Sequence, residues 1–407
     1  MDNKMKFRVI AAIAMFSVVV LIGGCQAGNN NTHKQWMNEA KDRYLSLRSG
    51  MKLQMAVQQF ETGDFEQCER TLNEAMGMDP KNDSLALLAG RLSLEKGRLE
   101  RALHWFNRAI ELEEKNADAF YYRGVVQQRW KRYEQALESY HGAYELEKDN
   151  PSYLLAEAEI LVALDFVDAA ISKVEDKLDY FDHIAGLRVA LAHMYRVKGD
   201  HEKAAHYFGQ ASMLEPENLK LREEQAISQV SAKDFQTAVV SLKALLENPE
   251  YVTRNDLRRL LAEAYEGASQ VKDARRIYAD LTGTRDSQVD DWIRYGELSW
   301  AMKDWSGALR AANRVMSTAP DRHEGYLLAG MISQKRGRLD QAIKYFDRSA
   351  ELALGDAVPC ILRGLSLQKA GRKSAAVEAY REALRREPED LRARKLLQSL
   401  VPDQMSY

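Results

Sequence analysis

The histidines are the first candidates for chemistry in this chain, because an imidazole can act as a general base or bind zinc near neutral pH. His201 and His206 are five residues apart, and His193 lies one predicted helix earlier. A zinc helix needs the His-Glu-x-x-His spacing, and this pattern is absent, as are the P-loop, Gly-x-Gly-x-x-Gly and Gly-x-Ser-x-Gly motifs. The sequence therefore predicts no catalytic residue, no metal site, no cofactor and no enzymatic activity.

Cysteine is the second reactive residue type, and the chain has three cysteines among its 407 residues. Three cysteines cannot form a disulfide framework or a cysteine-rich zinc site. Cys68 occupies a small-residue position of a predicted helix, so a packed thiol is expected there. Cys25 differs from the others because it follows a long apolar run.

The first 24 residues have the pattern of a targeting segment. Lys4, Lys6 and Arg8 precede an apolar run over residues 9–22 that only Ser17 interrupts. The run is shorter than the roughly 20 residues of a membrane-spanning helix, and a basic flank before such a run is typical of a secretory signal. An uncleaved N-terminal anchor is the alternative.

The residues that end this run, Leu-Ile-Gly-Gly-Cys at positions 21–25, resemble the lipobox of bacterial lipoproteins, with Gly23 where alanine or serine is commoner. The resemblance implies cleavage before Cys25 and lipid attachment to its thiol. Several acyl chains on one residue hold a protein at a membrane. Gln26 in place of aspartate implies sorting to the outer membrane, facing the periplasm. A secretory signal followed by an unmodified Cys25 is the alternative.

After the predicted signal segment, the pattern of residue types repeats with a period of 34 residues. Alanines recur at this step from Ala102 to Ala238, a single step of 36 leads to Ala274, and the 34-residue steps resume through Ala376. Twelve residues before each member of this series, and before Cys68, lies another small residue: Ala56, Gly90, Gly124, Ala158, Ala192, Ala226, Ala262, Gly296, Gly330 and Gly364. Such a period indicates stacked supersecondary units.

A third series lies four residues after the first and is bulky and apolar, with the exception of Ala312. In the unit that begins at Ala117, the spacing predicts helices over residues 119–129 and 133–146, with Gly124 and Ala136 meeting where the helices cross. Asn150 and Pro151 are predicted to cap and start the next unit. The two extra residues near 248–251 are the candidate position for a kink between two sub-arrays.

This pattern resembles the tetratricopeptide repeat over about residues 49–390. The resemblance implies an all-α, right-handed superhelical solenoid of about ten helix-turn-helix units with capping helices. The expected organisation is a signal peptide (1–24), a polar tether (25–32), an N-terminal capping helix (33–48), repeats one to six (49–252), repeats seven to ten (253–390), and a C-terminal capping helix and tail (391–407).

Stacked hairpins curve around an extended concave surface. In tetratricopeptide proteins the first helix of each unit lines that surface, and the resemblance implies a groove that binds protein or peptide partners. The residues expected on its exposed face are Tyr121, Gln128, Glu159, His193, Arg196, Glu223, Arg259, Glu263, Glu297 and Trp300. The near-neutral formal charge of −2 argues against a nucleic-acid partner, and no small-molecule substrate is expected.

Together these features predict a membrane-anchored scaffold that binds protein partners in the bacterial envelope, for instance in pilus assembly, secretion or polysaccharide export. One alternative is an adaptor that delivers substrates to an envelope protease or cell-wall hydrolase. A cell-wall enzyme is the least favoured alternative, because helical repeats do not by themselves bring polar side chains together in a pocket.

Overall fold

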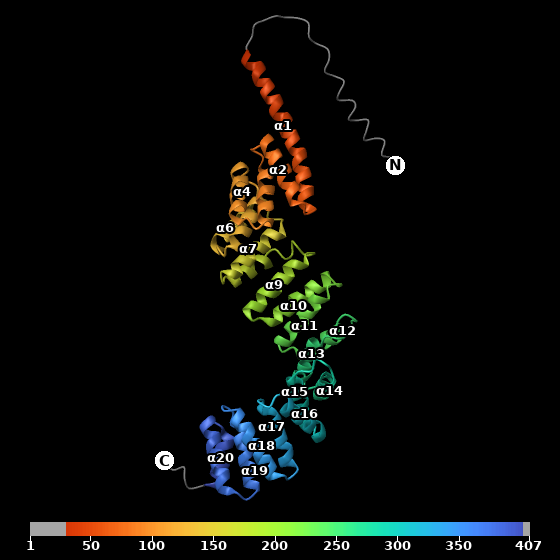
Figure 1. Cartoon of the computed structure of the whole chain (residues 1–407), viewed down its shortest axis with the longest axis vertical. Coiled ribbons are helices and arrows are strands. Elements are labelled where there is room, and N and C mark those ends of the chain that lie inside the picture. The colour runs from red at the N-terminus through yellow and green to blue at the C-terminus, as the bar shows by residue number, and fades with distance from the viewer. Residues whose placement is uncertain (1–29, 402–407) are drawn as a thin grey trace. The chain divides into compact units, whose positions relative to one another are not determined.

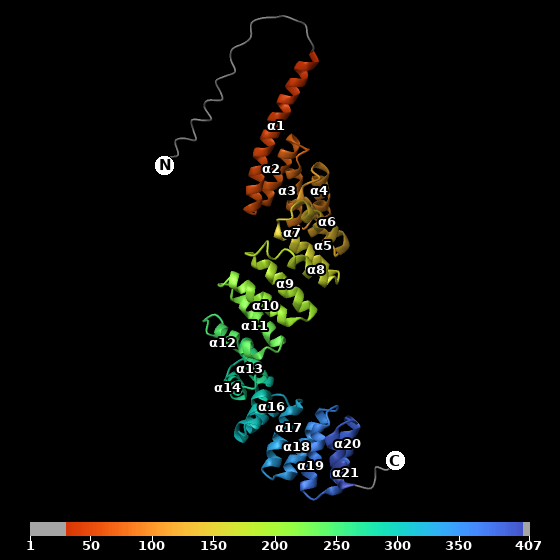
Figure 2. The ribbon, with the colours of Figure 1, turned by 180° about the vertical axis from the view of Figure 1, so that it is seen from behind.

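The computed structural model describes residues 30–401, which contain twenty-one helices and no strand (Figures 1 and 2). The predicted signal segment and Cys25 lie outside the described residues. The chain divides into two compact units, unit 1 up to Lys148 and unit 2 from Asp149. The all-α fold predicted from the repeat is confirmed.

Unit 1 contains three helix pairs. Its helices are α1 (Asn30–Glu61), α2 (Phe65–Met78), α3 (Asp83–Glu95), α4 (Leu99–Leu112), α5 (Ala117–Arg129) and α6 (Tyr133–Leu146). The predicted helices over 119–129 and 133–146 therefore agree with α5 and α6 to within two residues.

Unit 2 contains seven further pairs and a final single helix. Its helices are α7 (Pro151–Ala163), α8 (Val167–Glu175), α9 (Ala185–Lys198), α10 (His201–Leu214), α11 (Leu219–Ser231), α12 (Phe235–Leu246), α13 (Asn255–Gly267), α14 (Val271–Thr282), α15 (Val289–Ala301), α16 (Trp305–Thr318), α17 (His323–Lys335), α18 (Leu339–Leu352), α19 (Val358–Lys369), α20 (Lys373–Arg386) and α21 (Leu391–Leu400).

The two helices of each pair pack against each other, and within each unit the second helix packs against the first helix of the next pair. We call the odd-numbered helices α1 to α19 the A helices and the even-numbered helices the B helices. Asn150 caps α7, since its side chain accepts the backbone N–H of Ser152 and Pro151 occupies the first turn, as predicted.

One left-handed residue turns the chain from A helix to B helix in all ten pairs. These residues are Gly63, Gly97, Lys131, Asp165, Gly199, Lys233, Ser269, Lys303, Gly337 and Gly371. A positive φ at this position lets the next residue close the helix end, as where the N–H of Arg132 donates to the carbonyl of Gln127 at 2.9 Å. In five of the turns the residue with positive φ is not glycine, and this backbone conformation is energetically unfavourable for residues with a side chain.

The helix crossing in the third pair is filled by an aromatic ring. A β-carbon added to Gly124 would lie 2.7 Å from the ring of Tyr140, whose atoms are its nearest neighbours. Ala136, the other small residue expected at the crossing, is fully buried. The missing side chain of Gly124 therefore makes room for a ring of the B helix.

The N-terminal end also differs. No separate capping helix forms over residues 33–48, because α1 runs unbroken from Asn30 to Glu61. No proline interrupts this stretch, and Gly50 is tolerated inside the helix. Trp36, Met37 and Tyr44, which lie within the predicted capping helix, are exposed. At the other end, α21 packs against α20 as the predicted trailing helix.

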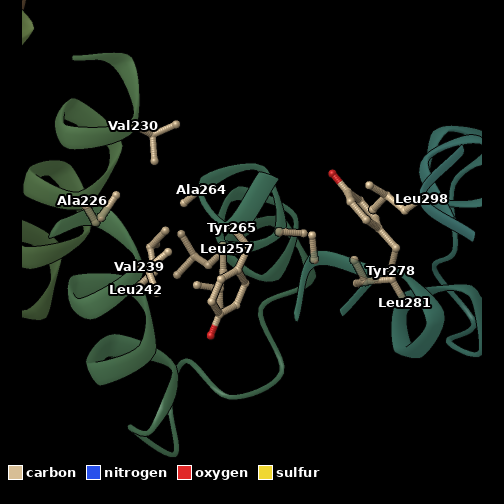
Figure 3. Close-up of a cluster of buried hydrophobic side chains, with 14 of the residues drawn as sticks. Ala226, Val230, Val239, Leu242, Leu257, Ala264, Tyr265, Tyr278, Leu281 and Leu298 are labelled. Carbon is tan, nitrogen blue, oxygen red and sulfur yellow. The ribbon is translucent and has the colours of Figure 1, made fainter. Parts of the chain in front are cut away.

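The two extra residues lie in the loop between α12 and α13. Buried side chains continue across this loop, from Leu242 of α12 through Leu257 and Tyr265 of α13 to Leu298 of α15 (Figure 3). The insertion is therefore accommodated within the core of unit 2.

Candidate partner-binding face

The A helices of unit 2 form the more closely spaced layer of the stack. A helices of successive pairs contact each other directly, as α11 does with α13, α15 with α17, and α17 with α19. In a curved array of hairpins the closely spaced layer lies on the inner side. We call the surface of α13, α15 and α17 the inner face.

A polar depression of about 560 Å³ lies on this face between α13 and α15. Arg259 and Asp291 form its most ordered contact, since Nε and one terminal nitrogen of the guanidinium donate to the two carboxylate oxygens at 2.7 and 2.8 Å. Asp291 is only 1% exposed, and it also accepts the backbone N–H of Gln288 at the start of α15. This pair stabilises the depression and leaves little capacity for another ligand.

The remaining carboxylates of the polar depression outnumber the bases. Burial raises the pKa of Glu266, an effect that Arg294 opposes and that Glu297 and Glu263 reinforce. Burial and the carboxylate of Glu266 also raise the pKa of the Tyr278 hydroxyl. Arg294 is shared, because it forms an ion pair with Glu297 at 3.0 Å. The inner face is therefore negatively charged at this point.

An apolar depression of about 370 Å³ adjoins it between α15 and α17. Its walls are mainly apolar: Trp292, Ile293 and Trp300 of α15, Ala311, Ala312 and Val315 of α16, Leu327, Leu328 and Met331 of α17, and Val358. Glu297, His323 and Glu324 also line it. Glu297 connects the two depressions through its ion pair with Arg294 of the polar one.

Four of the ten predicted groove residues line these depressions. Arg259 and Glu263 line the polar one, and Glu297 and Trp300 line the apolar one. Arg259, however, forms an ion pair with Asp291. Its guanidinium therefore stabilises the wall of the polar depression, and its charge is largely neutralised by this partner.

The other six predicted residues are not among the residues that line the two depressions. Their places are Tyr121 and Gln128 on α5 of unit 1, Glu159 on α7, His193 and Arg196 on α9, and Glu223 on α11. Gln128 accepts the hydroxyl of Tyr140 at 2.6 Å, and Tyr121 packs near the same ring. Arg196 bonds His193 and Glu224, both at 2.7 Å, and Glu223 bonds Arg254 at 2.8 Å. Glu159 is exposed.

Sequence reasoning missed Trp292, Leu327 and Met331, which appear in the chain as ordinary core residues of A helices. The sequence signal that points to these residues is Ala312, the one small residue in the series of bulky apolar residues. Where the bulky side chain is absent, a space remains, and the neighbouring side chains form its walls.

The surroundings of the described histidines and cysteines show packing and hydrogen bonding rather than a metal site. His206 lies 2.9 Å from the amide of Gln210, and residues 30–401 hold no group of three ligating side chains placed for a metal ion. Cys68 and Cys360 are unpaired and buried. Burial raises the pKa of both thiols, that of Cys360 to about 11, which lowers the thiolate fraction and with it the reactivity of each.

Residues 36–55 of α1 present a second exposed surface, the α1 stripe. From Met37 onward its residues recur every three or four positions on one side of the helix, and Trp36 precedes them: Trp36, Met37, Ala40, Tyr44, Leu47, Met51 and Met55. Trp36 is 67% exposed and Leu47 73%. Lys41, Arg43 and Arg48 border the stripe. No helix within residues 30–401 combines the length and hydropathy needed to span a bilayer.

Comparison with sequence families identifies tetratricopeptide repeats in the chain. Residues 90–129 match a TPR repeat, and residues 185–218, 323–356 and 361–397 match the family described as Tetratricopeptide repeat. These stretches fall on helix pairs of the solenoid in both units, such as α9–α10 and α17–α18. No curated protein matches the chain.

Several solved structures are similar to the chain at low identity. A tetratricopeptide repeat protein from Parabacteroides merdae is 15% identical, covers 62% of this chain and 99% of its own, and gives a TM-score of 0.42. The APC/C hetero-tetramer Cut9–Hcn1 is 12% identical, with coverages of 92% and 99% and a TM-score of 0.40. YrrB, described as a TPR protein with an unusual peptide-binding site, is 16% identical, with coverages of 49% and 97% and a TM-score of 0.38.

Proposed function

We propose that this tetratricopeptide-repeat chain is a scaffold that holds protein partners on its inner face while a lipid on Cys25 anchors it in the bacterial envelope. The observation that carries the proposal is the pair of adjoining depressions on α13, α15 and α17, one negatively charged and one apolar. A surface with an apolar centre and a charged border is the usual composition of a site for a peptide segment.

The anchoring part of the proposal is supported by the lipobox-like residues before Cys25 and by the α1 stripe. An exposed row of aromatic and aliphatic side chains bordered by bases suits the interface of an anionic membrane. The stripe begins eleven residues after Cys25, at Trp36, so an acylated N-terminus would bring it to the bilayer surface. Gln26 favours the outer membrane, facing the periplasm. Pilus assembly, secretion and polysaccharide export are the processes we propose for such a scaffold.

Site-specific photocrosslinking in the native bacterium tests the binding part. A photoreactive phenylalanine at Met331 or Glu297 is expected to give a discrete adduct with a second protein. The same residue at Lys344, exposed on the B helix α18, is the matched control and is expected to give none. Equal crosslinking at all three positions, or at Lys344 alone, would contradict an inner-face binding site.

Metabolic labelling with a radioactive fatty acid tests the anchor. Wild-type chain is expected to incorporate label and to sediment with outer-membrane vesicles, and Cys25→Ala is expected to lose the label. Label that persists in Cys25→Ala, or an unlabelled wild type, would refute lipidation at this residue.

A further inference from the structure

We propose that the apolar depression between α15 and α17 binds one large apolar side chain of a partner peptide, and that a neighbouring lysine or arginine of the same peptide pairs with the carboxylates of the inner face. This inference rests on the proposed function and specifies the chemistry of the partner.

The argument begins with a regularity in the repeats. In four pairs the A helix carries a glycine whose missing side chain is replaced by an aromatic ring of the B helix, sixteen residues later. These are Gly90 with Phe106, Gly124 with Tyr140, Gly330 with Phe346, and Gly364 with Tyr380. All four rings are 1% exposed or less. Glycine in the middle of a helix costs stability, so each ring compensates by filling the space.

The pair α15–α16 breaks this regularity. Gly296 is present, but Ala312 stands where the ring is expected. Leu328 of α17 lies against Gly296 instead, with its Cδ2 2.6 Å from the place of an added β-carbon. Ala311, Ala312, Val315 and Leu328 are left to line the apolar depression, which no side chain of the described residues fills. The repeat lacks its own ring at the point where the cavity opens.

The size and walls of the depression suit a side chain. A volume of about 370 Å³ is at the small end of ligand sites. Trp292 and Trp300 provide two aromatic walls, and Met331 provides a flexible one that adapts to different apolar shapes. Nε1 of Trp292 is buried without a hydrogen-bond partner, and a turn of the indole toward a peptide carbonyl at the rim would supply one.

The negative charge beside the apolar depression favours a peptide that carries a basic residue next to its apolar one. Glu263 and Glu297 are exposed and Glu266 is partly buried, so three carboxylates face one guanidinium, that of Arg294. A lysine or arginine beside the apolar residue would restore the balance through charge-assisted hydrogen bonds. Acidic peptides and nucleic acids are repelled by the same carboxylates.

Ala312→Phe is the decisive variant, because it gives this repeat the ring that other repeats already contain. Phe346, the equivalent ring one repeat later, has Leu362 at the position of Leu328, so the fold already accommodates this combination. The variant is expected to keep the helical circular dichroism spectrum of the wild type, with Leu328 displaced from the space that the new ring takes. Met331→Arg, at a partly buried position, is the second variant should the added ring disturb packing.

The experiment is a selection of random twelve-residue peptides displayed on phage against the purified full-length chain in detergent. The expected consensus holds a large apolar residue and at least one lysine or arginine. Affinity of a selected peptide is expected to fall by at least about tenfold in Ala312→Phe, the loss from one unburied apolar side chain. Glu263→Lys should weaken it severalfold, and Lys344→Phe on α18 should leave it unchanged.

The outcomes separate this inference from the proposed function. Peptides that crosslink to Met331 yet bind Ala312→Phe as tightly as wild type would overturn the side-chain pocket and leave the inner-face scaffold standing. Absence of any crosslink to the inner face would overturn both. A consensus without basic residues refutes the charge argument. Self-association of the wild type that Ala312→Phe abolishes would identify a second copy as the occupant and overturn a peptide partner.

Discussion

The contact between Gly124 and Tyr140 makes the helix crossing open to a quantitative test. A β-carbon on Gly124 would lie 2.7 Å from both Cδ1 and Cε1 of the Tyr140 ring. The ring is 1% exposed, and its hydroxyl donates to Gln128 Oε1 at 2.6 Å, so it cannot withdraw without losing that bond. Gly124→Ala should therefore overpack the crossing, which costs about 1–3 kcal/mol.

Gly50→Ala is the matched control. Gly50 also lies inside an A helix of unit 1, but nothing comes within 4 Å of its added β-carbon. Both variants gain the same helix propensity, about 1 kcal/mol. Gly50→Ala is then expected to stabilise the chain by about that amount, while Gly124→Ala is neutral or destabilising by up to about 2 kcal/mol.

The assay is urea unfolding together with amide hydrogen exchange of peptides from α5 and α6, because repeats in a solenoid can open locally. In a Tyr140→Leu background the Gly124→Ala change should become favourable, as with the native pair Ala226 and Leu242. If Gly124→Ala and Gly50→Ala raise stability equally in the wild-type background, the close packing of the Tyr140 ring against Gly124 is refuted.

Three further predictions concern single residues. Lys303→Gly relieves a left-handed turn residue with φ of 63° and should stabilise unit 2 by about 1 kcal/mol, which thermal melting would detect; an unchanged midpoint would mean that the turn carries no strain. Arg259→Met strips the buried Asp291 of its ion pair and should cost about 3 kcal/mol in urea unfolding, and a loss below 0.5 kcal/mol, the scale of an ordinary surface change, would contradict the pairing. Burial raises the pKa of Glu266, so as pH rises the unfolded chain releases this proton first and stability falls. Glu266→Gln should therefore melt higher than wild type at neutral pH and equally below about pH 4; a variant that melts lower at neutral pH would reverse this sign.

The break at Ala312 shows how far the sequence alone leads. The series of bulky residues contains one alanine, and that exception is visible without coordinates. The cavity that results is not visible in the sequence, because the two helices could equally have packed more closely and closed the space beside Gly296. The structure shows that Leu328 from the following repeat takes the place of the ring and that a cavity remains.

The helical hairpins and their approximate number follow from the sequence, because burial of one face per helix imposes a local period that survives in the residue types. For the one hairpin whose bounds were predicted, they agree with α5 and α6 to within two residues. Which side chains of neighbouring helices contact each other depends on the tertiary structure. The ring of Tyr140 fills the space beside Gly124, α1 continues where a separate cap was expected, and Arg259 is paired with Asp291. These outcomes depend on side-chain volume and on partners in other helices, as Tyr140 is for Gly124 and Asp291 for Arg259, and the sequence of a single helix encodes neither.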